Sequence, residues 1–465
     1  MSLTRTLCEK IAATDFDAVG QPALEAARQL MLDGLAVAVA GSGELPITIL
    51  TEHYRSLGGT PEASVIGRGF RSSSVTAAAI NGASMHVLDF EPMWSPANHA
   101  LSTTLPAILA LAQTRASTGR EIVTALVKGC EIQGWIREAS GQYEPRGHKF
   151  HPPGAVGPMG AAVAAGHLLR LDAGKLAHAL GIAASRCGSL LSNVGTMTKS
   201  THCGHAAALG LESALLAERG FTANPETFDV PGGYADAFYA GSFQPEKMLG
   251  FGPPFRVVQP GYALKMFPSQ FATHFVITAG LELHQKIGEP SAIQAVRITG
   301  PVMPYVDRPQ PATGLAGKFS VQYAAASSLL DGCVKIATFR DGRRFAPDME
   351  ALLPKVSLYM DPAIPARFEK MHVELEVTLR DGRTFHSRCN GPRGIWGGDP
   401  VSPEEHLVKV GDCLSVGFAR EQVEQCVALA SKINQLDSSG VAALLALIER
   451  SGVDRAARLK FAAEG

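Results

Sequence analysis

The sequence lacks long apolar runs and an excess of charge of either sign. No run approaches the roughly 18 apolar residues that a membrane-spanning helix needs, and the N-terminus lacks the apolar core of a signal peptide. Lys and Arg number 42 against 43 Asp and Glu, so no global field attracts the chain to nucleic acid or to a membrane surface. We therefore expect no nucleic-acid or membrane partner, and an anionic ligand would be bound by cations gathered locally.

Paired cysteines and nucleotide-binding motifs are also missing. The eight cysteines are scattered from Cys8 to Cys426 without a C-x-x-C pair, which is typical of free thiols in a reducing compartment and predicts a cytoplasmic protein. The chain has no G-x-x-x-x-G-K-[ST] phosphate loop, no G-x-G-x-x-G after a predicted strand and no G-x-S-x-G elbow. These absences argue against nucleotide cofactors and serine hydrolysis.

What the chain has in quantity is Ala, Leu and Gly in helical patterns. From about residue 16 to 260, apolar residues recur three and four apart, and several segments are apolar on all sides. Such segments predict the central helices of a bundle, whose small residues allow close approach. Asp172 is placed to cap the N-terminus of one helix, and Gly220 lies where another helix should end.

The composition changes near residue 290. Alternation of apolar and polar residues across 372–386, with an Asp381-Gly382 turn, predicts a β-hairpin. Helical periodicity then returns in the C-terminal segment. We predict a mostly α fold with an α+β part: a large all-helical domain formed by residues 1–265 and 403–465, and a smaller α+β lid domain formed by residues 266–402.

Asp89 and His99 are the first candidate site residues. They flank a short stretch that contains Pro92 and Pro96, which cannot continue a helix. A loop of this kind after an Ala-rich helix can present polar groups to a cleft. Taken alone, the pattern favours a capping role for Asp89 and a local backbone contact for His99.

His151, Lys199 and Lys265 complete the candidate set. His151 precedes two prolines and an apolar helix, so it would lie at a helix N-terminus, where carboxylates bind readily, or on the surface. Lys199 begins a small-residue helix that should be buried, and a buried lysine needs a partner or a depressed pKa. A lysine extended to solvent is the alternative for Lys199, and a solvated linker lysine is the alternative for Lys265. Together with Asp89 and His99, these residues predict a site that holds a small polyanion and moves a proton.

A metal site is a competing interpretation of His202 and His205. Histidines three residues apart share a helix face and can hold a metal ion together. The sequence offers no third and fourth ligand at a fixed spacing from them. We therefore predict no metal.

Six blocks of the chain resemble the MmgE/PrpD family, which includes 2-methylcitrate dehydratases, cis-aconitate decarboxylases and iminodisuccinate epimerase. The blocks are VLDF (87–90), FHPPG (150–154), TKSTHCGHAA (198–207), KMFP (265–268) with a histidine at 274, KFSVQY (318–323) and LLDG (329–332). The resemblance covers nearly the whole chain. It implies a large helical domain with a smaller α+β lid, a homodimer, and no cofactor or metal.

The decarboxylase-like pocket pattern of this family can be carried over residue by residue. It places an aspartate, two histidines, two lysines and a tyrosine on Asp89, His99, His151, Lys199, Lys265 and Tyr323. Two positions depart from the pattern: Met93 stands where a threonine would face the substrate, and Gln270 stands where the decarboxylases have a histidine. Glutamine cannot shuttle a proton at neutral pH, so a mechanism that relies on that histidine is in doubt.

The retained residues suit a reaction that removes a proton alpha to a carboxylate. Lys199 and Lys265 would stabilise the resulting aci-carboxylate, His151 would act as the base, and His99 or a lysine would return the proton. Because Met93 and Gln270 remove two polar groups of the decarboxylase pattern, we predict a cofactor-independent isomerase that epimerises a small dicarboxylate such as iminodisuccinate. The alternatives are a lyase, either a 2-methylcitrate-type dehydratase or a cis-aconitate-type decarboxylase, and a non-catalytic tricarboxylate-binding protein.

Overall fold

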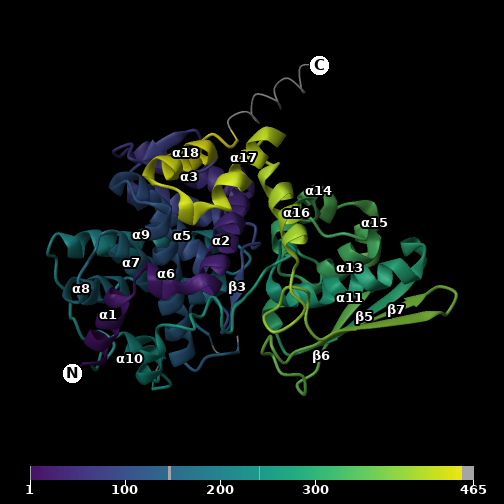
Figure 1. The fold of residues 1–465 in the computed structure, drawn as a ribbon. Helices are drawn as coiled ribbons and strands as arrows, with labels where there is room; N and C mark the ends of the chain where they lie inside the picture. Colours follow the sequence, from purple (N-terminus) through teal and green to yellow (C-terminus); the bar gives the residue numbers. More distant parts are fainter. Residues whose placement is uncertain (1, 145–147, 240, 453–465) are drawn as a thin grey trace.

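The computed structural model describes residues 2–144, 148–239 and 241–452. Its buried apolar residues form two separate cores. The larger core lies in a body of helices, and the smaller core lies in a unit of mixed strands and helices beside it (Figure 1). The fold is therefore mostly α with an α+β part, as the sequence predicts.

The helical body begins at the N-terminus, and its central helices are apolar on all sides. Its helices are α1 (Leu3–Ala13), α2 (Phe16–Gly41), α3 (Leu45–Leu57), α4 (Ser74–His86), α5 (Ala100–Arg115), α6 (Gly119–Ala139), α7 (Pro152–Leu168), α8 (Ala173–Ala184), α9 (Thr198–Glu218) and α10 (Tyr234–Tyr239). A short ribbon of β1 (Ala63–Val65) and β2 (Phe70–Ser72) precedes α4. The two predicted helix ends are confirmed: Asp172 accepts a hydrogen bond from the Lys175 amide, and Gly220 has the positive φ of a residue that follows a helix.

Two glycines let α4 and α9 approach each other closely. A Cβ atom on Gly204 of α9 would lie 2.1 Å from the Ala79 carbonyl oxygen of α4, and a Cβ atom on Gly82 would lie 2.8 Å from the Gly204 Cα atom. Only glycine fits at these positions without a shift of one helix. The approach matters because α4 ends at His86 and α9 begins just before Lys199.

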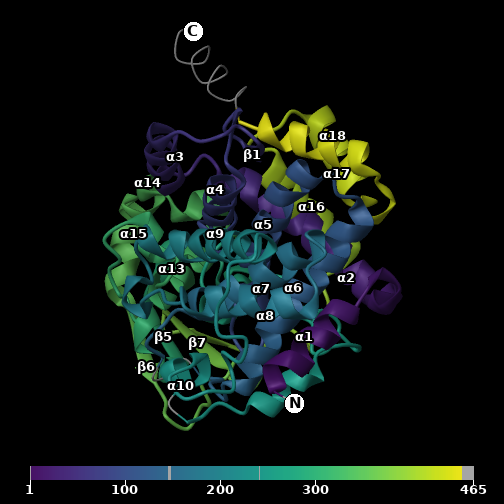
Figure 2. The same ribbon diagram turned by 90° about the vertical axis from the view of Figure 1, so that its left-hand side faces the viewer.

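The C-terminal helices return to the helical body. These are α16 (Pro403–Leu414), α17 (Arg420–Ala430) and α18 (Ser438–Glu449), which carry the yellow end of the colour scale (Figure 2). Val410, Cys413 and Leu414 of α16 belong to the larger core, where α16 packs against α2. The domain boundaries at 265/266 and 402/403 stay predictions.

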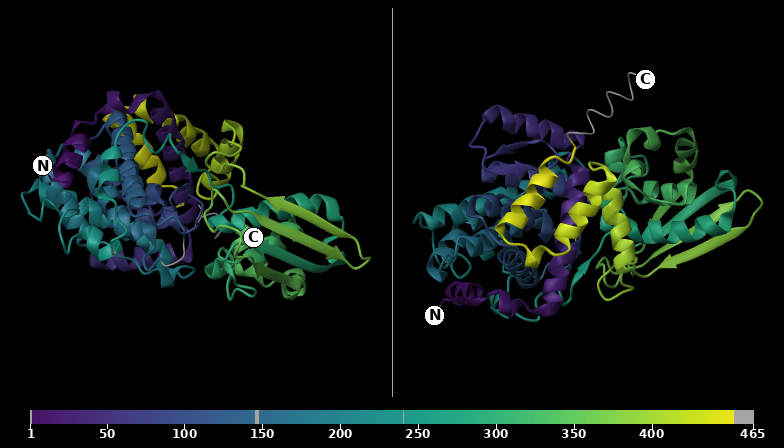
Figure 3. Two further views of the ribbon diagram at one scale, coloured as in Figure 1. Left: turned by 90° about the horizontal axis from the view of Figure 1, so that it is seen from below. Right: turned by 45° about the horizontal axis from the view of Figure 1, so that its top comes forward.

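The smaller unit is built on a four-stranded sheet. The sheet has the order β6 (Val356–Met360), β5 (Ile293–Gly300), β7 (Val373–Leu379) and β8 (Thr384–Cys389). Strands β5 and β6 are parallel and the other neighbours are antiparallel. The predicted hairpin is confirmed as β7 and β8, which turn at Asp381-Gly382 and project away from the helical body (Figure 3). The helices of this unit are α11 (Phe271–Ile287), α12 (Gly314–Gly317), α13 (Val321–Asp331), α14 (Asp341–Arg344) and α15 (Pro347–Leu352).

A two-residue ribbon joins the two units. Strand β3 (Met93–Trp94) pairs antiparallel with β4 (Tyr262–Ala263), with Met93 opposite Ala263. This pairing holds the loop that follows α4 against the segment that crosses into the smaller unit. Asp89 and Lys265 meet for this reason, although they are 176 residues apart in the sequence.

No single helix in the described ranges is long and apolar enough to cross a membrane. The pair of α2 and α3 passes that test only when joined, and the two helices are bent by 84° at their junction. The second half of α2 is buried in the larger core.

Candidate active site

A cavity of about 550 Å³ lies between the helical body and the smaller unit. Its histidine wall comes from the helical body and the crossing segment, and consists of Asp89, His99, His151, Lys199 and Lys265. Its aromatic wall comes from the smaller unit, and consists of Gln270, Phe271, Tyr305, Arg308, Phe319 and Phe368. Met93 also lines the cavity, so the structure brings seven of the eight candidate residues together.

Asp89 is held in an unusual backbone conformation directly after α4. Its φ of 53° lies in the left-handed region, which Asp tolerates better than most residues, and its amide donates to the His86 carbonyl oxygen at 2.9 Å. The buried carboxylate accepts from the Lys199 ammonium group at 2.7 Å and also from that of Lys265. Burial alone would raise the pKa of Asp89, but these two ammonium groups lower it well below its usual range.

Three lysines bind three successive carbonyl groups of the loop that carries Asp89. Lys318 donates to the Leu88 oxygen at 3.0 Å, Lys265 to the Asp89 oxygen at 2.8 Å, and Lys409 to the Phe90 oxygen at 2.9 Å. The three lysines come from the smaller unit, the crossing segment and the C-terminal helix α16. The loop is therefore fixed from three directions, which holds the Asp89 carboxylate in place for the site.

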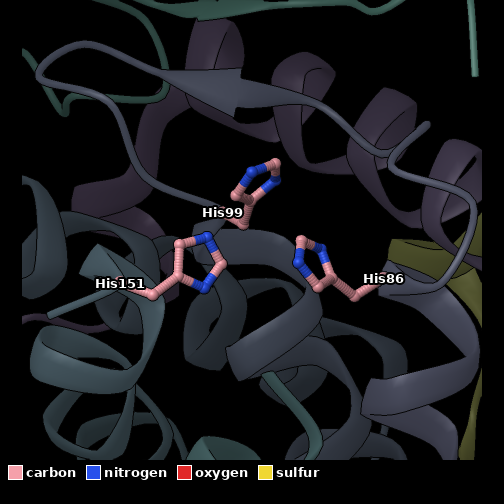
Figure 4. A group of neighbouring side chains, drawn as sticks. All are labelled: His86, His99 and His151. Atoms are coloured by element: carbon pink, nitrogen blue, oxygen red, sulfur yellow. The ribbon is translucent and has the colours of Figure 1, made fainter. Parts of the chain in front are cut away.

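The rings of three histidines, His86, His99 and His151, converge on one another (Figure 4). The ring of His86 lies 4.5 Å from that of His99 and 5.7 Å from that of His151, centre to centre. His86 Nδ1 donates to Glu91, which leaves Nε2 to accept from the Lys199 ammonium group at 2.9 Å. Burial and the charge of Lys199 lower the pKa of His86 to about 3, so its ring is neutral.

Glu91 is the buried carboxylate that orients this histidine pair. His99 Nδ1 lies 3.0 Å from Glu91 Oε1, and Ser102 donates to the same oxygen at 3.0 Å. Burial would raise the pKa of Glu91, but the adjacent rings of His86 and His99 lower it well below its usual range. Sequence reasoning missed His86 and Glu91 as site residues. The available signal was a histidine one turn before Asp89 and a carboxylate two residues after it.

His151 occupies the predicted place at the N-terminus of α7. It is the N-cap residue of that helix, and its amide donates to the Ser189 carbonyl oxygen at 2.8 Å. Its Nδ1 atom lies 3.1 Å from His202 Nδ1, so one of these two rings donates to the other. Burial, followed by the charge of Lys199, lowers the pKa of His151 well below its usual range. A neutral His151 can accept a proton.

The three histidines also form one of three groups of possible metal ligands among the described residues. Nitrogen atoms of His86, His99 and His151 lie within 4.8 Å of one another. Both ring nitrogens of His86 already serve in hydrogen bonds to Glu91 and Lys199, so a metal ion there would have to displace the ammonium group. His202 is buried beside His151, whereas His205 is exposed. The absence of a metal stays a prediction.

The aromatic wall contains residues that sequence reasoning singled out and residues that it missed. Gln270 caps α11, because its Oε1 atom accepts from the Ala272 amide at 2.6 Å, and its Nε2 atom donates to the Tyr305 hydroxyl at 3.2 Å. Arg308 donates to the Val194 carbonyl oxygen at 3.0 Å and lies over the ring of Phe319. Tyr305 lies in the short 3-10 helix Pro304–Val306 and Arg308 in the loop after it. This segment has no recognisable motif, which is why the sequence alone did not point to these two residues.

Tyr323 is the one candidate residue that the structure does not bring to the cavity. It lies in the core of the smaller unit with no exposed surface, and its hydroxyl donates to the Thr338 carbonyl oxygen. The KFSVQY block instead contributes Lys318, which binds the loop at Leu88, and Phe319, which lines the cavity. The assignment of Tyr323 to substrate binding therefore has no support in the geometry.

The charges that line the cavity suit a ligand with several negative groups. Among the described residues, the lining carries four cationic side chains, Lys149, Lys199, Lys265 and Arg308, against the single carboxylate of Asp89. The neutral imidazole of His151 stands on the same wall as Lys199 and Lys265. The opposite wall is largely aromatic. The arrangement can hold a polyanion, move a proton and shield one part of the ligand from water.

Comparison with known proteins identifies the family. Residues 5–246 match the MmgE/PrpD N-terminal domain, and residues 267–434 match the MmgE/PrpD C-terminal domain. The chain belongs to the MmgE/PrpD family. The match to the C-terminal domain runs past the sheet and into α16 and α17, which pack on the helical body of this MmgE/PrpD protein.

Several relatives within the family are lyases by name. The chain is 31% identical to a cis-aconitate decarboxylase of Mus musculus over 427 residues, which covers 89% of this chain and 87% of the relative. It is 28% identical to a cis-aconitate decarboxylase of Homo sapiens, with 95% and 93% covered. It is 27% identical to a 2-methylcitrate dehydratase of Escherichia coli (strain K12), with 69% and 71% covered. These relatives favour the lyase alternative over the predicted epimerase.

Proposed function

We propose that this protein is a cofactor-independent lyase of a small tricarboxylate, and that the reaction is decarboxylation of an unsaturated acid of the cis-aconitate type. The relatives that cover about nine tenths of the chain support a lyase. One observation supports the choice of substrate class. The described lining of the cavity has four cationic side chains and one carboxylate, so positive charge is in excess. A trianion would match this excess, whereas a dianion would leave part of it without a partner.

The proposed reaction breaks one carbon–carbon bond and uses one proton. The bond between the departing carboxyl group and its methylene carbon breaks, and its electron pair forms a new carbon–carbon double bond. The original double bond shifts its electrons toward a neighbouring carboxylate, which becomes an aci-carboxylate. A proton then adds to the carbon beside that carboxylate. The products are carbon dioxide and an unsaturated dicarboxylate.

Each step has a candidate residue in the cavity. Lys199 and Lys265 would stabilise the aci-carboxylate, because its negative charge grows as carbon dioxide leaves. His151 would deliver the proton. Its pKa is depressed in the free protein, but a bound trianion favours the protonated ring and would raise that pKa. The departing carboxylate would face the aromatic wall, where poor solvation favours its loss as neutral carbon dioxide.

Gln270 and Met93 set this protein apart from the decarboxylase pattern. Gln270 is bound to the Tyr305 hydroxyl and to the first turn of α11, so it holds the rim of the cavity and supplies no titratable group. The reaction proposed here accordingly takes its proton from His151. Met93 would enlarge the apolar surface around the departing carboxylate.

Dehydration of a 2-methylcitrate-type acid is the second candidate function. The neutral state of His151 favours it, because a dehydratase must first remove a proton alpha to a carboxylate. The same lysines would then stabilise the carbanion. The hydroxyl group would leave with a proton from His99 or from the protonated His151.

The deciding experiment is proton NMR in deuterium oxide. The purified protein is given cis-aconitate, 2-methylcitrate and iminodisuccinate in separate tubes, each with and without a chelator. We expect loss of carbon dioxide from cis-aconitate, with one deuterium in the product. Formation of an alkene from 2-methylcitrate alone would move the assignment to a dehydratase. Deuterium exchange with stereochemical scrambling of iminodisuccinate would restore the epimerase.

Two further parts of the proposal concern the protein in the cell. A cytoplasmic location and a homodimer are predictions that gel filtration and fractionation can check. The non-catalytic alternative predicts tight binding of a tricarboxylate without deuterium incorporation into any of the three acids. Incorporation into one of them excludes that alternative.

A further inference from the structure

A second hollow shares one segment of chain with the catalytic cavity. It has a volume of about 260 Å³, and its lining includes Arg137 at the end of α6 and Phe238 of α10. His148, Lys149 and Pro152 line both the hollow and the catalytic cavity. His151, the proposed proton donor, lies within this shared segment. A ligand bound in the hollow can therefore change the position of His151 through the segment 148–152.

Arg137 is a buried cation without an acidic partner among the described residues. Only 2% of its surface is exposed, and its guanidinium donates to the Gln142 carbonyl oxygen at 2.7 Å and to the Ser140 hydroxyl at 3.3 Å. Its Nε atom has no hydrogen-bond partner among the described residues.

The other buried arginines show how unusual this arrangement is. Arg256 is 6% exposed and pairs with Glu138, and Arg344 is 4% exposed and pairs with Glu350. A buried guanidinium that has lost its water needs a negative partner to offset the desolvation penalty. For Arg137, the described part of the chain supplies only neutral acceptors, among them the Tyr239 hydroxyl.

His148 adds a second unpartnered polar atom to the same hollow. Its Nε2 atom is buried and has no hydrogen-bond partner among the described residues. Lys149 follows it and is exposed at the rim. The hollow thus gathers a guanidinium, an imidazole and an ammonium group, with no carboxylate in its described lining. Such a set of donors recognises an oxyanion through charge-assisted hydrogen bonds.

We propose that this hollow binds a small oxyanion, a carboxylate or a phosphate group, between Arg137 and His148, and that its occupancy alters catalysis through the segment 148–152. The anion would take the free Nε–H of Arg137 and the Nε2 atom of His148, and so draw the segment toward α6. Because His151 caps α7 from this segment, its position in the catalytic cavity would respond. The binding itself is independent of the reaction that the catalytic cavity performs.

The first test measures binding without turnover. Inorganic phosphate and succinate are titrated in separate experiments into the Lys199→Ala protein, which weakens anion binding in the catalytic cavity, at constant ionic strength. We expect saturable binding seen by calorimetry and a shift of the His148 ring resonance in NMR, assigned with His148→Gln. Binding of succinate alone identifies a carboxylate ligand, and binding of phosphate alone identifies free phosphate.

Variants of Arg137 then locate the site. Arg137→Lys keeps the positive charge and loses the planar guanidinium group, and Arg137→Gln loses both. We expect affinity to fall at least tenfold in each, with Arg297→Gln on the sheet as a matched surface control. If Arg137→Gln unfolds, the affinity of Arg137→Lys and the His148 resonance of the Lys199→Ala protein still measure binding in the hollow. Unchanged affinity in the Lys variant, or an absent His148 shift, means that Arg137 only caps the C-terminus of α6.

Steady-state kinetics test the coupling between the hollow and the catalytic cavity. In the wild-type protein, saturating anion should change kcat/KM for the substrate at least twofold at constant ionic strength, and Arg137→Lys should abolish this response. A response of equal size in Arg137→Lys would place the effect in the catalytic cavity and overturn the coupling. Failure of the lyase assignment would leave the binding experiments unaffected.

Discussion

The two walls of the catalytic cavity differ in origin and in chemistry. The histidine wall is fixed to helix ends and to the lysine-bound loop of Asp89, and its groups are charged or can carry a proton. The aromatic wall comes from the start of α11 and from short turns and loops of the smaller unit, and Arg308 is the charged side chain of that wall. The comparison teaches that the rigid helical body supplies the chemistry, while the smaller unit supplies the shape and recognises the substrate.

The largest expected effect comes from the histidine wall. Lys199→Ala should lower kcat/KM by about 10²–10³-fold, because it removes charge stabilisation that grows in the transition state. Asp89 keeps its contact with Lys265 in this variant, so the fold should survive. Steady-state kinetics with Lys175→Ala, an exposed lysine on α8, provide the control. A change of less than threefold would remove Lys199 from the mechanism.

Arg308→Gln should have a smaller effect of a different kind. We expect KM for the tricarboxylate to rise about 10–100-fold with kcat nearly unchanged, because a charge-assisted hydrogen bond contributes about 1.5–3 kcal/mol. The affinity for a dicarboxylate inhibitor should differ less between the variant and the wild type than KM for the tricarboxylate does. Arg297→Gln, on the exposed face of β5, is the matched control. A fall in kcat as large as that of Lys199→Ala would erase the distinction between the walls.

The neutral His86, whose Nε2 atom accepts from Lys199 of the histidine wall, predicts how stability depends on pH. The folded-state pKa of His86 is about 3, below its unfolded value near 6.5, so the unfolded chain binds more protons in this window. The free energy of unfolding should therefore decrease as the pH falls below about 6.5, by up to about 1.4 kcal/mol per pH unit from His86. Urea unfolding of the wild type and of His86→Gln between pH 4.5 and 7.5 measures the difference, and identical slopes would show that His86 is protonated in the fold.

The smallest expected effect concerns Tyr323. Because its hydroxyl is bound to the Thr338 carbonyl oxygen away from the cavity, Tyr323→Phe should lower the free energy of unfolding by about 1 kcal/mol and leave KM within twofold. Tyr305→Phe, in the aromatic wall, should raise KM more. If the two variants raise KM equally, Tyr323 reaches the substrate after all.

Local features of the fold were predictable because they depend on neighbours in the sequence. The hairpin at Asp381-Gly382, the cap at Asp172 and the helix end at Gly220 each rest on a pattern of a few residues. The predicted place of His151 at a helix N-terminus is confirmed for the same reason. The family resemblance added the identity of the residues that would meet, without their geometry.

The contacts inside the site depend on neighbours in space, and sequence reasoning found them only in part. His86 looks like an ordinary residue of an Ala-rich helix until the glycines of α4 and α9 bring it to Lys199, 113 residues away. Tyr305 and Arg308 carry no pattern at all. Tyr323 was misplaced because a block of matching residues does not say which of its side chains turns toward the cavity.

The sequence by itself determined the helical body, the sheet, and a set of residues that can bind a polyanion and move a proton. It could do so because periodicity, caps and turns act over a few residues, and because charged groups in apolar segments need partners. Only the tertiary structure decided that Asp89 joins lysines 110 and 176 residues away, and that Arg137 has no acidic partner among the described residues. Burial and distance set pKa values and partners, and both exist only once the chain has folded.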